Sequence, residues 1–349
     1  MCYAAAVLLL TGLLLAPASA AGLDQETPEE TFGDSITVAL DTLTVRVVDN
    51  AGRPIPDLGP EDFRVRVRGR EIPVTAVDWV SSETSSRIRA ETLPLEEADH
   101  ARAPEPEGKL VVFFVQADLN PTRISGQMRL RPYTRELLAT LHPADRIAVV
   151  SYDSHLKLWL DFTADHEAVH AAVDRAQLFA RPPGIGPQAA PSLAAHFDPA
   201  EGRRAASPEK ALEVTARSLS RLPGEKTMLY LGWGLGRFGA GGVRMTPDYK
   251  PAVQALNAAR ASVFVLDVTS ADYHSLEVGL QSVAAATGGL YASTFRLPNV
   301  ATDRVSQAIS GYYVLTFDRA ALEAAGGGRL EVTLRGRRGE VLARSISVR

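Results

Sequence analysis

Three short motifs in this chain have residue types and spacings that could carry chemistry. Asp118, Asn120 and Thr122 alternate as oxygen-bearing side chains, a spacing that suits a hard octahedral cation such as Mg²⁺. The segment 166–170 reads H-E-x-x-H, in which two histidines one helical turn apart hold zinc and the glutamate activates water. The segment 234–239 reads G-x-G-x-x-G, a dinucleotide-binding pattern. Each motif predicts a different class of protein. Which prediction is favoured depends on the strands and helices that position each motif.

The Asp118 motif directly follows an uninterrupted apolar run. Leu110 to Val115 shows no polar alternation, which is typical of a strand buried on both faces of a parallel sheet. In doubly wound folds, ligands bind beyond the carboxyl ends of the strands. Asp118, Asn120 and Thr122 are therefore predicted binding residues, with a weak Mg²⁺-type metal site as one possibility. Alternatively, Asp118 and Thr122 cap the next helix or satisfy loop N–H groups.

The H-E-x-x-H match makes a zinc metallopeptidase the alternative function. His166 and His170 would be the zinc ligands and Glu167 the general base, with a third ligand among Glu201, Glu209 and Glu213 that nothing in the sequence selects. The core face of this helix is best drawn through Val169, Ala172, Val173 and Ala176, which turns the histidines toward its flank or solvent. A solvated helix face is the favoured interpretation, and no enzyme activity is expected.

The glycine-rich segment lacks the surroundings of a dinucleotide site. Gly241, Gly242 and Pro247 delay the next helix, and residue 254 is Gln where an acidic residue about 20 positions on is required. No nucleotide cofactor is expected. A mobile loop is the better interpretation, and with Trp233 and Phe238 it could offer an apolar contact surface to a partner. Asp267 ends another strand at the same predicted edge, where a buried, hydrogen-bonded carboxylate is the favoured role.

Strands and helices alternate between Lys109 and about Ser310, which predicts an α/β domain with a doubly wound, mainly parallel sheet. Two helices have predicted hydroxyl N-caps before a proline, at Ser207-Pro208 and Thr246-Pro247. Gly288-Gly289 should close the helix from Ser275. The predicted strands are 110–115, 146–152, 157–160, 227–231, 262–266 and 290–292.

The ends of the chain have a different character. Residues 1–20 form a predicted signal peptide, with an apolar run before the small-x-small site Ala18-Ser19-Ala20; an uncleaved anchor is the alternative. Cys2 is the only cysteine, so the mature chain would have no disulfide or thiolate chemistry. A net charge of −4 gives no reason to expect nucleic acid. The predicted location is secreted or periplasmic.

Short β patterns flank the α/β region. We expect an N-terminal β segment over 21–80, a flexible acidic linker over 81–108, the α/β domain over 109–310 and a C-terminal β segment over 311–349. Neither β segment has strands enough for a stable sheet alone. We therefore predict that the two pair into a small β-sandwich.

This order, together with the local sequences, resembles the von Willebrand factor type A (VWA) family, in particular exported, Acidobacteria-type "VWFA-related" proteins. The pieces that carry the resemblance include LVVFFVQADLNPT, LHPADRIAVVSYDSHLKLWLDFTAD, GEKTMLYLGWGL, ASVFVLDV and GYYVLTF. The resemblance implies a protein-binding module, often with Mg²⁺ in a metal-ion-dependent adhesion site.

The resemblance also defines what such a metal site would require. Its first loop aligns with Asp118, Asn120 and Thr122. Its threonine loop falls within Arg181 to Ser207, which has no Gly-Thr signature, and its final aspartate is replaced by Gly232, Trp233 and Gly234. The expected function is non-catalytic binding of an unknown protein or ligand through these residues, at a degenerate metal site. A structural envelope component is the second alternative.

Overall fold

The computed structural model describes residues 40–81, 108–178, 180–186, 188–345 and 347–348. The predicted signal peptide and nearly all of the predicted linker lie outside these residues. Within them, no helix is both long and apolar enough to cross a membrane.

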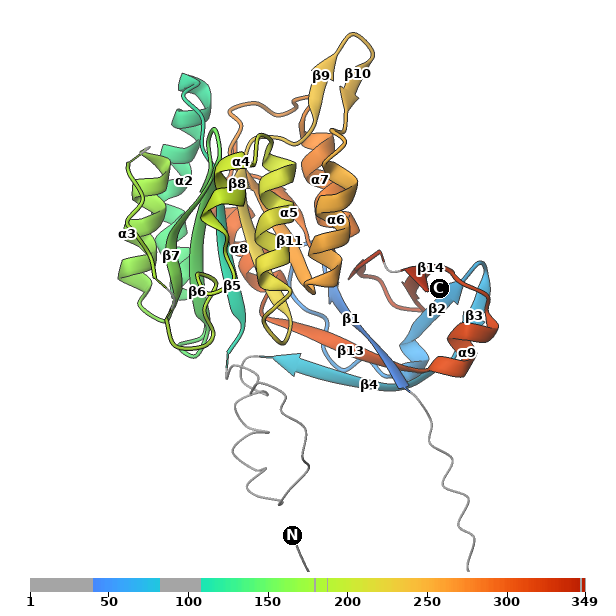
Figure 1. Cartoon of the computed structure of the whole chain (residues 1–349). Coiled ribbons are helices and arrows are strands. Elements are labelled where there is room, and N and C mark those ends of the chain that lie inside the picture. Colours follow the sequence, from blue (N-terminus) through green and yellow to red (C-terminus); the bar gives the residue numbers. More distant parts are fainter. Residues whose placement is uncertain (1–39, 82–107, 179, 187, 346, 349) are drawn as a thin grey trace, which may run out of the picture. The chain divides into compact units, whose positions relative to one another are not determined.

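The centre of the α/β domain is a six-stranded sheet in the order β12-β11-β8-β5-β6-β7 (Figure 1). Five strands run parallel, and the edge strand β7 is antiparallel to β6. The predicted fold class is confirmed, including the mainly parallel sheet. The strands are β5 (Leu110–Gln116), β6 (Arg146–Tyr152), β7 (Leu156–Thr163), β8 (Lys226–Gly232), β11 (Ala261–Asp267) and β12 (Tyr291–Ser293).

Helices cover both faces of this sheet, because every residue of β5, β8 and β11 is buried and needs apolar cover on each side. One core includes side chains of α2 (Pro121–Ala139), α3 (His166–Gln177) and α8 (Pro298–Ala308). The other includes side chains of α5 (Pro208–Leu219), α6 (Tyr249–Ala258) and α7 (Glu277–Ala286). The short α4 (Pro199–Arg204) contacts β7.

Two of the three predicted helix ends are confirmed. Ser207 caps α5, and its hydroxyl accepts a hydrogen bond from the N–H of Lys210. Gly288 has a φ of +69°, and the N–H of Gly289 donates to the Ala284 carbonyl, which closes α7 as predicted. The predicted cap at Thr246 is wrong. Thr246 lies in a turn, and α6 begins at Tyr249.

The N- and C-terminal β segments pair with each other, as the predicted sandwich requires. One sheet has the order β15-β1-β13-β4 and the other β16-β14-β2-β3. Their inner faces share one apolar core, in which the Phe63 and Tyr313 rings meet edge to face at 5.6 Å. The strands are β1 (Leu40–Val48), β2 (Phe63–Val67), β3 (Arg70–Ile72), β4 (Val74–Ser81), β13 (Gly311–Asp318), β14 (Gly328–Leu334), β15 (Glu340–Ala343) and β16 (Ser347–Val348).

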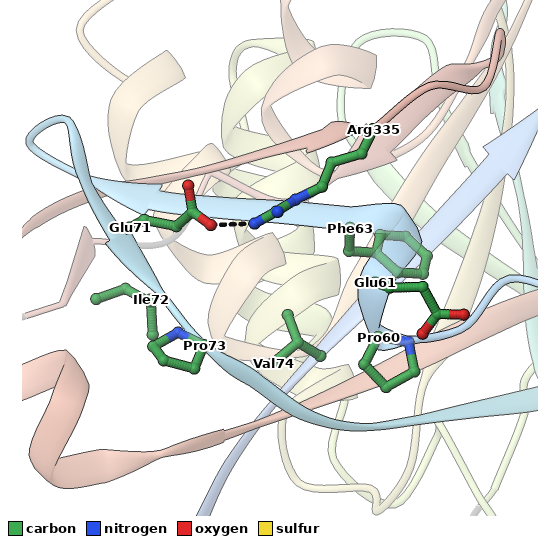
Figure 2. A pocket seen from close by; sticks show the side chains of 8 residues that line it. All are labelled: Pro60, Glu61, Phe63, Glu71, Ile72, Pro73, Val74 and Arg335. Atoms are coloured by element: carbon green, nitrogen blue, oxygen red, sulfur yellow. Dashed lines mark hydrogen bonds and ion pairs between the residues drawn. The ribbon is translucent and has the colours of Figure 1, made fainter.

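A hollow of about 410 Å³ lies on the sandwich, beside the short helix η1 (Pro60–Asp62). Figure 2 shows the ion pair of Glu71 and Arg335 beside it. These two charges satisfy each other, and the hollow is far in sequence from every predicted site residue. Its lining is Pro60, Glu61, Phe63, Glu71, Ile72, Pro73, Val74 and Arg335.

Two buried arginines join the sandwich to the amino end of the parallel sheet. Arg46 on β1 donates to the Ser262 hydroxyl at 3.1 Å, and Arg344, which follows β15, pairs with Glu225 before β8. Burial lowers the pKa of Arg46 to about 10. Burial, with the charge of Arg46, lowers the pKa of Arg344 to about 9. Desolvated cations at a junction need the Glu225 carboxylate as a counter-charge.

Candidate functional site

The loops that follow β5, β8 and β11 meet at the carboxyl edge of the sheet, because these strands are neighbours and run parallel. A buried side chain that sequence reasoning missed fixes two of them together. Gln116, the last residue of β5, accepts hydrogen bonds from the N–H groups of Trp233 and Gly234 and donates to the Gly234 carbonyl. An amide at the end of an otherwise apolar strand is the sequence signal for such a clasp.

The predicted metal motif forms a hydrogen-bonded turn. The Asp118 carboxylate accepts from the N–H of Asn120 at 2.8 Å. The Asn120 amide oxygen accepts from the N–H of Thr122 at 3.0 Å and from its hydroxyl at 2.7 Å. The N-cap of α2 is Asn120, and not Asp118 or Thr122, which were the predicted caps. The motif's oxygens already satisfy local donors.

A side-chain cation occupies the space next to Asp118. The guanidinium of Arg123, in the first turn of α2, pairs with the Asp118 carboxylate. The same guanidinium lies over the Trp233 ring, 3.2 Å from its centroid. The three side chains form a stack at the carboxyl edge, in which the negative charge of Asp118 is neutralised from within the chain. A divalent ion at Asp118 would have to displace this arginine.

The second predicted loop leaves no room for a further carboxylate at two of its three positions. A Cβ atom on Gly232 would lie 2.3 Å from the Tyr230 ring and 2.6 Å from the Gln116 amide oxygen. A Cβ on Gly234 would lie 2.5 Å from that of Leu276. Trp233 is thus the one side chain this loop presents, and it faces Arg123. The loop 232–234 thus places an indole, and no carboxylate, beside Arg123 and Asp118.

The segment that the resemblance aligns with a threonine loop is held elsewhere. The Asp161 carboxylate on β7 accepts from the Ser192 hydroxyl and from the N–H of Leu193, both at 2.6 Å. This binds the segment to β7, at the opposite edge of the sheet from β11 and β12. The described part of the segment makes no hydrogen bond or ion pair with Asp118.

The glycine-rich segment after β8 is a hairpin, formed by β9 (Arg237–Gly239) and β10 (Gly242–Arg244). It projects beyond the sheet edge (Figure 1). Gly236 has a φ of +88°, a conformation that glycine adopts at little cost. Its N–H donates to the Glu209 carboxylate at 2.6 Å, and Glu209 is buried in the first turn of α5. A buried carboxylate therefore anchors the base of the predicted loop.

The H-E-x-x-H residues occupy the first turns of α3. Val169, Ala172, Val173 and Ala176 are buried, as predicted. Glu167 is exposed beside Arg135 at 3.2 Å, and His170 faces Asp174 at 3.5 Å. Among the described residues, these histidines belong to no cluster of three metal-ligand side chains.

A cluster that sequence reasoning missed lies at the carboxyl end of β11. The buried Asp267 carboxylate is 2.6 Å from Nε2 of His274 and accepts from the Tyr291 hydroxyl at 2.8 Å and the Thr269 N–H at 2.9 Å. Burial raises the pKa of Asp267, but hydrogen bonding and the charge of His274 outweigh it, so the pKa lies below its usual value. Asp267 is a buried, hydrogen-bonded carboxylate, as predicted. Its partners lie 7 and 24 residues away, which no local motif reveals.

Large exposed apolar side chains gather at this edge. Seven such side chains occur among the described residues, and six lie in the loops, the hairpin or the first helical turns that come after the parallel strands β5, β8, β11 and β12. Leu119 follows β5 and is 74% exposed, Phe238 follows β8 and is 71% exposed, and Tyr273 follows β11 and is 85% exposed. Leu178, at the end of α3, is the exception. The remaining three are Val278, Leu297 and Val300.

No protein-family model matches the sequence, and no curated protein matches it. A von Willebrand factor type A structure from Catenulispora acidiphila is similar over 84% of this chain and 74% of its own, with 14% identity and a TM-score of 0.41. An aerotolerance-related membrane protein from Bacteroides fragilis is similar over 57% of this chain and 98% of its own, with 11% identity and a TM-score of 0.37.

A third structure, BatB from Bacteroides thetaiotaomicron, is similar over 57% of this chain and 97% of its own, with 14% identity and a TM-score of 0.37.

Proposed function

We propose that this chain is a non-catalytic protein-binding module of the cell envelope or secreted space. It binds its partner through the loops at the carboxyl edge of the six-stranded sheet. The degenerate metal site contributes Asp118 and Trp233 to this surface through their shared contact with Arg123, and no Mg²⁺ is needed.

The observation that carries the proposal is the distribution of exposed apolar side chains. Leu119, Phe238 and Tyr273 follow three adjacent strands, and each leaves most of its side chain in water. Apolar surface gathered on one side of a soluble domain is typical of an interaction site, and aromatic residues are enriched in the centres of protein interfaces.

The loops have the rigidity that such a surface needs. Gln116 fixes the loop after β8 to the end of β5, and Glu209 holds the base of the β9–β10 hairpin. A preformed surface loses less conformational entropy on binding than a mobile one. The proposal thus keeps the predicted binding edge and replaces a mobile glycine loop with an anchored hairpin.

A comparison of two variants tests the proposal. Leu119, Phe238 and Tyr273 are changed together to Ser, and Leu178→Ser serves as a matched exposed-apolar control. Each protein is immobilised and exposed to envelope extract, and thermal unfolding checks that each variant is folded. We expect a partner captured by the wild type to be retained by Leu178→Ser and reduced at least tenfold by the triple variant, since interface aromatics are frequent hot spots.

Equal capture by the triple variant and the control would remove the proposal. Absence of any captured partner from the wild type would favour the structural envelope alternative. Protease activity that depends on His166 and His170 would instead support the metallopeptidase alternative.

A further inference from the structure

We propose that Asp267, His274 and Glu277 form a binding site for a divalent transition-metal ion of the Zn²⁺ class. The site lies at the carboxyl end of β11 and the start of α7. It is separate from the Asp118 motif and from the H-E-x-x-H motif.

The ligand atoms already converge. One atom from each of the three side chains lies within 4.8 Å of the other two. Zinc bonds of about 2.1 Å in tetrahedral geometry place ligand atoms about 3.4 Å apart. His274 and Asp267, now in contact at 2.6 Å, would separate slightly, while Glu277 would move inward. Partly exposed side chains on a loop and a first helical turn allow such adjustments.

Asp267 is held as metal-ligating carboxylates usually are. Its oxygens accept from the Thr269 N–H and the Tyr291 hydroxyl, and these contacts fix its orientation. Outer hydrogen bonds of this kind orient ligands and raise their affinity for the ion. Tyr291 comes from the neighbouring strand β12, so the support is provided by the sheet itself.

The charges at the site call for a cation. Glu277 makes no ion pair with any residue the structure describes, and it lies close enough to Tyr291 for its charge to contribute to the raised pKa of that phenol, after burial and Asp267. With a neutral imidazole, two carboxylates bring a charge of −2, which a divalent ion balances. His274 alone, when protonated, balances one of the two.

A buried hydroxyl with no hydrogen-bond partner among the described residues lies on the same face of the sheet as Asp267. Tyr230 is fully buried, and its hydroxyl has no hydrogen-bond partner among the described residues. Its ring covers Gly232, the residue paired in register with Asp267, and the charge of Asp267 contributes to the raised pKa of the phenol, after burial, Glu209 and Tyr152. Because Tyr230 lies two residues before Gly232, its side chain points to the same face of the sheet as Asp267.

The donor set distinguishes zinc from magnesium. One imidazole nitrogen and two carboxylates, with an open position, suit Zn²⁺. Mg²⁺ prefers six oxygen ligands in octahedral geometry and releases its waters reluctantly. The ion would tie the loop 269–276 to β11, and that loop carries the exposed Tyr273.

Isothermal titration with ZnCl₂, followed by metal analysis after dialysis, tests the site on the purified protein. We expect one equivalent of Zn²⁺ and no binding of Mg²⁺ at the same concentrations. His274→Ala and Glu277→Gln should each weaken Zn²⁺ binding at least tenfold. Both side chains are partly exposed, so these variants should stay folded, and thermal unfolding confirms this.

His166→Ala is the control that separates this site from the H-E-x-x-H motif, and it should leave Zn²⁺ binding unchanged. Binding lost in His166→Ala but kept in His274→Ala would overturn the proposal. So would a wild-type protein that retains no Zn²⁺. Neither result bears on partner capture, so the proposed function is tested independently.

Discussion

The guanidinium carbon of Arg123 lies 3.2 Å from the centroid of the Trp233 ring, and the same group pairs with Asp118. Arg123 therefore lies beside the first loop, next to the carboxylate that an ion would bind. Trp233 is in the loop where the family resemblance predicts an aspartate.

This stack predicts a measurable coupling between Arg123 and Trp233. Arg123→Ala should lower the free energy of unfolding by about 1 kcal/mol, the usual size of a partly exposed cation–π contact, and should shift tryptophan emission to longer wavelength. Arg123→Lys should give a smaller change, because an ammonium lacks the planar guanidinium. The emission shift must vanish in a Trp233→Phe background; a shift that persists there would come from another tryptophan.

A metal titration read by thermal unfolding should distinguish the Asp118 motif from the proposed Asp267 site. Zn²⁺ at 100 times its dissociation constant should stabilise the wild type by about 2.7 kcal/mol, and Mg²⁺ should leave the midpoint unchanged because Arg123 neutralises Asp118. His274→Ala should abolish the zinc effect. Stabilisation by Mg²⁺ that is lost in Asp118→Asn would show that a metal does bind at the first motif.

The anchor of the hairpin can be tested at Glu209. Glu209→Ala should destabilise the protein by about 1–3 kcal/mol, since it leaves the Gly236 N–H without its acceptor. Hydrogen exchange of β9 and β10 should accelerate, while β5 and β6 stay protected. Uniform exchange across the sheet, with no excess at the hairpin, would contradict the anchoring role.

Asp153 should contribute stability that depends on pH. Burial raises the pKa of this carboxyl. Hydrogen bonds from Lys157 and Ser154, together with the charge of Lys157, lower the pKa by more than burial raises it, so the pKa lies below its usual value. The unfolded chain, with a pKa of about 3.9, therefore binds the proton more readily. The stabilisation is fully present above the pKa of the unfolded state. It is lost as the pH falls through the lower pKa of the folded state.

Urea unfolding of Asp153→Asn beside the wild type measures this effect. The difference should be at most about 1 kcal/mol at pH 7, as for a partly exposed ion pair, and should disappear in acid. If the difference in unfolding free energy stayed constant down to pH 3, packing and not the charge of Asp153 would be its cause.

The junction between sandwich and sheet should depend on Glu225. Glu225→Gln removes the counter-charge of buried Arg344, with Arg46 nearby, and should lower the free energy of unfolding by about 3–5 kcal/mol. Replacing Glu225 by Gln together with Arg344 by Met should recover much of this loss, because no charge is then left unpaired. A double variant no more stable than the single one would argue against the ion pair as the cause.

Much of the fold follows from local patterns in the sequence. The apolar run Leu110 to Val115 is fully buried because a strand covered on both faces has no polar side, and Ser207 before Pro208 caps α5 because its hydroxyl reaches a free N–H. The antiparallel direction of β7 was not predicted, although its signal is present. Three residues connect β6 to β7, too few for a parallel crossover.

The position of the loop residues at the carboxyl edge was predicted from the sequence, but their contacts were not. Strand order alone brings Asp118 and Trp233 together, since β5 and β8 are neighbours although 115 positions separate the two residues in the sequence. Sequence reasoning identified both residues and missed Arg123 between them, because an arginine in a helix usually lies in water. It likewise missed the set formed by Asp267, His274 and Glu277, whose 7- and 10-residue spacing fits no familiar motif.

The sequence by itself thus determined which segments are buried, where most elements begin and which edge carries the loops, because burial and capping depend on neighbouring residues. Tertiary structure alone decided which charges meet. Asp118 meets an arginine, and Asp267 meets a histidine and a tyrosine. Electrostatic partners are set by distance in space, and at these loops the fold brings together side chains that the chain keeps apart.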